Sequence, residues 1–87
     1  AYAQSGRFEE AVARLAEAAV RVPDDPIITY NFACGLALAG QSRDALLQLG
    51  DAFRLDPKLA AHARTDPDLV SLHGLPEWVA LLGKYPS

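Results

Sequence analysis

Apolar residues recur every three or four positions along most of this chain, which is the pattern of helices that bury one face. One such stripe follows Gly6, with charged residues on the opposite face; its members are Phe8, Ala11, Val12, Leu15, Ala18, Ala19 and Val22. A second stripe consists of Ala45, Leu46, Leu49, Ala52 and Phe53. No stretch keeps up the two-residue alternation that is typical of a strand. The pattern therefore predicts an all-α fold.

Glycines and Asp-Pro pairs divide the apolar stretches from one another. Gly6 and Gly40 each follow a short apolar run, and glycine suits the left-handed position just past a helix end. The Asp-Pro pairs at 25–26, 56–57 and 66–67 each combine an N-cap acceptor with a proline at the first helical position. Together these signals predict helices at 1–5, 7–22, 26–39, 42–55, 57–64, 67–73 and 76–84.

The same pattern occurs twice, 34 residues apart. When residues 1–23 are laid over 35–57 without a gap, Gly6 falls on Gly40 and Pro23 falls on Pro57. The other identical pairs are Ala3/Ala37, Ala11/Ala45, Leu15/Leu49 and Ala18/Ala52. A helix–turn–helix unit with this period is the signature of the tetratricopeptide repeat.

The sequence resembles the tetratricopeptide repeat family over residues 1–57, with a partial repeat at 1–23 and a full repeat at 24–57. The small, helix-opening and closing positions of the family repeat are occupied by Ala33, Ala45, Ala52 and Pro57. Thr29 and Ser42 depart from it, because bulkier residues are usual at both positions. The resemblance implies antiparallel helix pairs that stack as a short right-handed solenoid.

Residues 58–87 do not continue the repeat, and their DPDL…LPEW…LL pattern resembles the ending of many bacterial tetratricopeptide arrays. The last repeat of a solenoid exposes an apolar face that something must cover. We expect residues 58–87 to form capping helices within a single structural domain. The apolar residues suited to this covering are Leu75, Trp78, Val79, Leu82 and Tyr85, with Leu69 and Leu72 beneath them.

Composition and charge exclude several functional classes. With 16 alanines and 13 leucines, the chain favours helix. The net charge is −3, and the basic residues are scattered singly, so we expect no nucleic acid partner. No apolar run approaches the roughly 20 residues of a membrane span, and no signal-peptide pattern opens the chain. We therefore expect no membrane partner, and the cytoplasm is the expected compartment. Because the sequence has no methionine, we expect a piece of a longer chain.

The sequence contains few groups that could carry out chemistry. Cys34 with His62 or His73 is the one conceivable nucleophile–base pair, but no basic residue stands near Cys34 in the sequence to lower the pKa of its thiol. These three residues also lack metal-ligand spacing. Helix capping accounts for the acidic residues. We therefore expect no enzyme, no metal and no cofactor. The acidic residues concerned are Asp24, Asp25, Asp66 and Asp68.

The resemblance also implies where a partner would bind. In the family, the first helix of each repeat lines a concave groove. The residues that correspond to this face here are Ile27, Tyr30, Asn31, Cys34, Leu38 and His62.

Asn31 matches the position at which chaperone-binding members of the family hold the C-terminal carboxylate of a peptide. That carboxylate clamp also needs two basic residues on the next helix, where this sequence has Leu59 and Ala63. We therefore expect no carboxylate clamp.

Three hypotheses about function remain. The first is a non-catalytic interaction or scaffold module that binds a peptide or partner protein on the concave face. The alternative is a structural or regulatory repeat tail of a larger bacterial enzyme or signalling protein. The third is self-association through the apolar face of the predicted helix 7–22, which belongs to the truncated first repeat.

Overall fold

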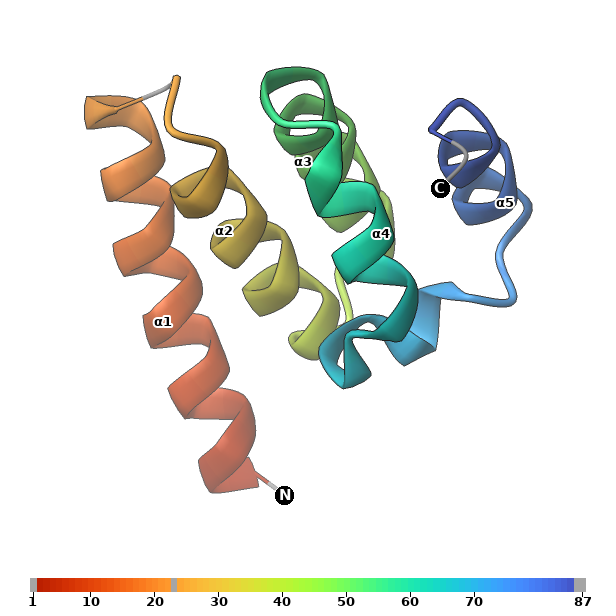
Figure 1. Ribbon diagram of the computed structural model, residues 1–87. Helices are drawn as coiled ribbons and strands as arrows, with labels where there is room; N and C mark the ends of the chain where they lie inside the picture. Colours follow the sequence, from red (N-terminus) through yellow and green to blue (C-terminus); the bar gives the residue numbers. More distant parts are fainter. Residues whose placement is uncertain (1, 23, 86–87) are drawn as a thin grey trace.

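The computed structural model of this 87-residue chain describes residues 2–22 and 24–85, and among these the side chains of residue 10 and of residues 12 onwards. Every regular element in these ranges is helical, which confirms the predicted all-α class. Consecutive helices run antiparallel (Figure 1). The elements are α1 (Tyr2–Arg21), α2 (Pro26–Leu38), α3 (Ser42–Leu55), α4 (Lys58–Thr65), the 3₁₀ helix η1 (Pro67–Leu72) and α5 (Pro76–Gly83).

The predicted start signals operate at the Asp-Pro pairs. Asp25 caps α2, since its Oδ1 accepts hydrogen bonds from the N–H groups of Ile27 and Ile28 at 2.9 and 3.2 Å. Asp66 caps η1 by accepting from the N–H of Asp68 at 2.9 Å. From α2 onwards the helix bounds agree with the prediction to within one residue. The segment predicted as a helix at 67–73 is a 3₁₀ helix, Pro67–Leu72.

The end of α2 has the turn that the glycine spacing predicts. Gly40 has a φ of +83°, a conformation that costs glycine little and other residues more. Its N–H donates to the carbonyl of Ala37 at 3.1 Å, and the N–H of Gln41 donates to the carbonyl of Leu36 at 2.9 Å. This pair of bonds is a Schellman motif, which satisfies the last carbonyls of α2 and turns the chain into α3.

The prediction of a corresponding break between two helices at Gly6 is wrong. The predicted helices 1–5 and 7–22 form one helix, α1, which runs through Gly6 without interruption. A five-residue helix is too short to be stable alone, whereas continuing an existing helix adds one hydrogen bond per residue. At the other glycine, Leu36 and Ala37 are buried immediately before the turn. A glycine thus permits a turn, but the packing on both sides of it decides whether one forms.

The core lies around α2, which packs against α1, α3 and η1. Gly35 lets α1 approach closely, because a Cβ there would lie 3.2 Å from Cγ2 of Val12. Val12 packs against the core, whereas Val22, at the end of the predicted stripe, is 46% exposed. The largest fully buried side chains are Phe53, Leu49, Leu69 and Leu72.

The C-terminal segment covers one side of α3. Helix α5 packs against α3, and Arg64 of α4 donates a 2.9 Å hydrogen bond to the carbonyl of Leu82. The predicted covering residues are buried or pack against the core, with one exception: Val79 is 63% exposed, so its predicted role in the covering is wrong. The buried or packed members are Leu69, Leu72, Leu75, Trp78, Leu82 and Tyr85.

Candidate functional site

The predicted binding residues of α2 divide into an exposed and a buried group. Ile27, Asn31 and Leu38 are exposed, and all three point to the same side of the helix, because residues advance by about 100° each. Tyr30 and Cys34 are 5% and 9% exposed, so neither is offered to a partner in this structure. The exposed group therefore forms the accessible part of the predicted surface.

The two buried residues belong to a polar cluster around Asp66. The Tyr30 hydroxyl donates to Oδ2 of Asp66 at 2.7 Å, and the Cys34 thiol lies 3.8 Å from the same oxygen. His62 Nε2 is also 3.8 Å from Oδ2, and its ring is 5.5 Å from the ring of Tyr30 between centroids. Asp66 thus joins α2 to the junction between α4 and η1.

The protonation states in this cluster follow from its burial and its hydrogen bonds. Burial, with the nearby negative charge of Asp66, raises the pKa of the Cys34 thiol to about 12. Burial and the hydrogen bond to Asp66 raise the pKa of Tyr30 far above its ordinary value. Burial alone would raise the pKa of Asp66, but the hydrogen bonds from Tyr30 and the Asp68 N–H, together with the electrostatic attraction of the nearby His62, outweigh it and lower that pKa. At neutral pH Asp66 is therefore ionised and the thiol is protonated, which makes Cys34 a poor nucleophile.

The same cluster contains a set of metal-ligating atoms. Single ligand atoms of Cys34, Asp66 and Asp68 all lie within 4.8 Å of one another, and zinc accepts thiolate and carboxylate ligands. However, both oxygens of Asp66 already accept hydrogen bonds within the chain, from the Tyr30 hydroxyl and the Asp68 N–H. We interpret the cluster as a structural link between helices and assign no metal to it.

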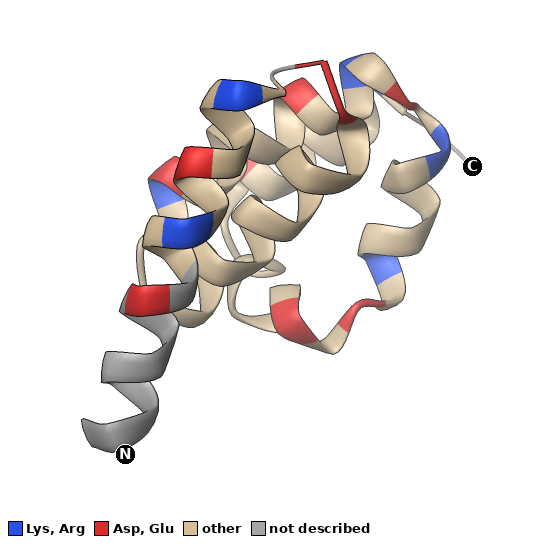
Figure 2. Cartoon of the chain, turned by 90° about the vertical axis from the view of Figure 1, so that its left-hand side faces the viewer, with Lys and Arg blue, Asp and Glu red and all other residues tan. Residues whose placement is uncertain are grey.

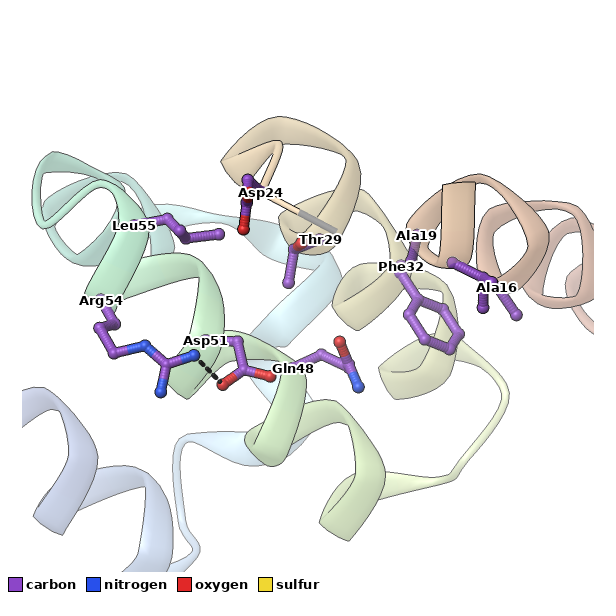
Figure 3. Close-up of a pocket in the computed structure, with 10 residues that line it drawn as sticks. Ala16, Ala19, Asp24, Thr29, Phe32, Gln48, Asp51, Arg54 and Leu55 are labelled. Carbon is purple, nitrogen blue, oxygen red and sulfur yellow. Dashed lines mark hydrogen bonds and ion pairs between the residues drawn. The ribbon is translucent and has the colours of Figure 1, made fainter. Parts of the chain in front are cut away.

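A hollow of about 540 Å³ lies between α1 and α3, with α2 as its floor (Figure 3). The α1 side is apolar and the α3 side is polar. On the α3 side, Arg54 Nη2 lies 2.9 Å from Oδ1 of Asp51. We call this hollow the α1–α3 groove; its lining residues are Ala16, Ala19, Val20, Asp24, Thr29, Phe32, Gln48, Asp51, Arg54 and Leu55.

None of the six predicted binding residues lines the α1–α3 groove. Its floor residues, Thr29 and Phe32, are rotated by about 200° and 140° from Ile27 around α2, so they lie on the opposite face. The family resemblance had predicted a binding surface on the other side of α2. One signal was available in the sequence. Asp24 and Asp25 are adjacent, and only one of them can cap α2; the structure assigns the cap to Asp25 and leaves Asp24 in the groove.

Comparisons with protein-family models, with curated proteins and with solved structures give no match for this chain. Among the described helices, none combines the length and the apolar character that crossing a membrane requires.

Proposed function

We propose that this chain is a non-catalytic interaction module that binds a peptide or a partner protein on one face of α2. We call this surface the α2 face; it consists of Ile27, Asn31 and Leu38, with His62 of α4 beside them. The carrying observation is the exposure of two large aliphatic side chains on the central helix of the fold: Ile27 is 52% and Leu38 is 40% exposed.

The spacing of these residues suits a peptide ligand. Ile27 and Leu38 are eleven positions apart, which is about 16 Å along a helix. An extended segment of about five residues, or about three turns of an amphipathic helix, covers that distance. Asn31 stands between them and offers an amide that can both donate to and accept from a peptide backbone.

The polar cluster supports this proposal by fixing the surface. The hydrogen bond from Tyr30 to Asp66 ties α2 to the α4–η1 junction, at the residue next to Asn31 in the sequence. A surface that is already rigid loses less conformational entropy when it binds. The resemblance to tetratricopeptide repeats supports the same face, since the first helices of such repeats line the concave side of a solenoid.

The test is a selection from a random-peptide display library, with the wild-type chain as bait. Peptides that bind the α2 face should bind the double variant Ile27→Asp/Leu38→Asp at least about tenfold more weakly, because carboxylates replace the apolar anchors. Val79→Asp is the control, since Val79 is an aliphatic residue on α5 that is more exposed than either Ile27 or Leu38. Circular dichroism checks that all three chains are folded. Selected peptides that bind the double variant as tightly as wild type would place the binding site elsewhere.

A further inference from the structure

We propose that the α1–α3 groove is a second binding site, and that its ligand is an extended peptide segment with an aliphatic residue next to a lysine or arginine. This site is independent of the α2 face, because the two surfaces lie on opposite sides of α2. Its lining residues indicate both halves of the ligand.

The α1 side of the groove selects the aliphatic residue. Val20 is 81% exposed although it lines the groove together with Ala16 and Ala19. The ring of Phe32 lies at the floor next to the two alanines (Figure 3). A shallower depression of about 350 Å³ on α1 shares Ala16 and Val20 with the groove, so the apolar surface continues past its edge. An aliphatic side chain placed here removes this surface from water.

The loop before α2 selects the cation. Asp24 lines the groove and is exposed. The neighbouring Asp25 makes the cap of α2, and within the described part of the chain the Asp24 carboxylate has neither a hydrogen bond nor an ion pair. Figure 2 shows acidic residues on this loop, between α1 and α2.

The opposite wall leaves this charge uncompensated. Asp51 is the second carboxylate of the groove, and Arg54 pairs with one of its oxygens. Two carboxylates against one guanidinium leave the lining negative, which attracts a cationic side chain and repels a phosphate or an acidic peptide.

The polar α3 wall favours a peptide as the ligand over a small apolar molecule. Gln48 lines the groove on α3, and its amide can donate to a peptide carbonyl and accept from a peptide N–H. A volume of about 540 Å³ is in the range of known ligand pockets. An extended segment with its backbone along Gln48 can direct an aliphatic side chain towards Phe32 and a cationic one towards Asp24.

The experiment is an NMR titration of the ¹⁵N-labelled chain with three synthetic peptides. They are acetyl-Gly-Ser-Leu-Leu-Lys-Leu-Ser-Gly-amide, the same peptide with glutamate in place of lysine, and the same peptide with serine in place of each leucine. We expect the first peptide to shift the amide signals of residues 16–20, 24, 32 and 48–55. The glutamate and serine peptides should each bind about tenfold more weakly or not at all.

Two variants localise the effect. Asp24→Asn removes the unpaired charge without touching the cap, and it should weaken the lysine peptide by about tenfold. Ala16→Gln places a polar amide in the apolar wall without changing its charge, and it should weaken the lysine peptide too. Glu77→Gln removes the same charge from an exposed site of α5, and it should leave binding of the lysine peptide unchanged. The double variant Ile27→Asp/Leu38→Asp on the α2 face should also leave binding of the lysine peptide unchanged.

Four outcomes would overturn the proposal. The first is no shift with the lysine peptide at millimolar concentration. The second is equal binding of the lysine and glutamate peptides. The third is a set of shifts confined to the α2 face, which would support the proposed function and remove this second site. If the free chain instead forms a dimer in sedimentation and groove signals change with its concentration, the occupant is a second copy and the peptide proposal fails.

Discussion

The Tyr30 hydroxyl and the Asp66 carboxylate, 36 residues apart in the sequence, form a 2.7 Å hydrogen bond. The same carboxylate caps η1 through its other oxygen. One side chain therefore both starts a helical turn and joins that turn to α2. This link holds the central helix against the C-terminal segment, and the stability of the fold should depend on it.

Tyr30→Phe removes only the hydroxyl of this link. We expect a loss of about 1–3 kcal/mol in the free energy of unfolding, because hydrogen bonds to charged groups are among the stronger ones and the partly buried carboxylate loses a donor. Chemical denaturation followed by circular dichroism measures the loss. Tyr85→Phe is the matched control, since no hydrogen bond of the Tyr85 hydroxyl occurs among the described residues. Equal losses in the two variants would show that the link contributes nothing.

The pH dependence of stability should depend on Asp66. Its pKa is lower in the folded state than the ordinary value of about 3.9 for aspartate. Its charge therefore stabilises the fold fully above about pH 4, and this contribution is lost as the pH falls through the lower folded-state pKa.

Asp66→Asn should accordingly be less stable than wild type at neutral pH, and the difference should shrink as the solution is acidified below about pH 4. Denaturation curves at neutral and acidic pH measure the difference in the free energy of unfolding between the two chains at each pH. Asp44→Asn, which removes the same charge at an exposed site of α3, provides the control. A difference between Asp66→Asn and wild type that does not change with pH would contradict the prediction.

The Cys34 thiol should be almost inert in the folded chain. Burial and the charge of Asp66 raise its pKa to about 12. At about pH 8 the reactive thiolate is then about a thousandfold rarer than for an unperturbed thiol with a pKa of about 8.5. Alkylation by iodoacetamide, followed by mass spectrometry, should be slow for the native chain and rapid in concentrated guanidinium chloride. Comparable rates in the two solutions would mean that the thiol is accessible and ionisable.

The turn at Gly40 should tolerate no side chain without cost. Because its φ is +83°, Gly40→Ala should lower the free energy of unfolding by about 1–2 kcal/mol. Gly74→Ala is the comparison: among the described glycines only Gly40 has a positive φ, and nothing lies within 4 Å of a Cβ at Gly74. Thermal unfolding should show that the stability of Gly74→Ala is nearly the same as that of wild type, or slightly higher. A Gly40 variant as stable as the Gly74 variant would refute the role of the left-handed turn.

Periodicity and capping chemistry made much of the fold predictable. The apolar stripes and the Asp-Pro pairs depend on interactions within a few residues, so they located α2 to α5 to within about one residue. The failure at Gly6 has the opposite origin. Gly6 and Gly40 occupy the same place in the repeat, yet α1 continues through Gly6, whereas Gly40 follows the buried end of α2.

The surfaces were less predictable, because they depend on contacts between residues far apart in the chain. The family resemblance placed Tyr30 and Cys34 on a groove-lining face, but both are buried and contact Asp66 at the α4–η1 junction. The α1–α3 groove combines Asp24 of the loop before α2 with the Asp51–Arg54 pair of α3, which no local pattern joins.

The sequence by itself determined the helical class, the caps at Asp25-Pro26 and Asp66-Pro67, and the 34-residue spacing, since helix periodicity and capping are local properties of the backbone. Only the tertiary structure decided that α1 runs through Gly6, that Asp66 accepts from Tyr30, and that a groove opens between α1 and α3. These features depend on how helices pack in three dimensions. Packing sets which side chains lose their contact with water, and it brings charges from distant segments together.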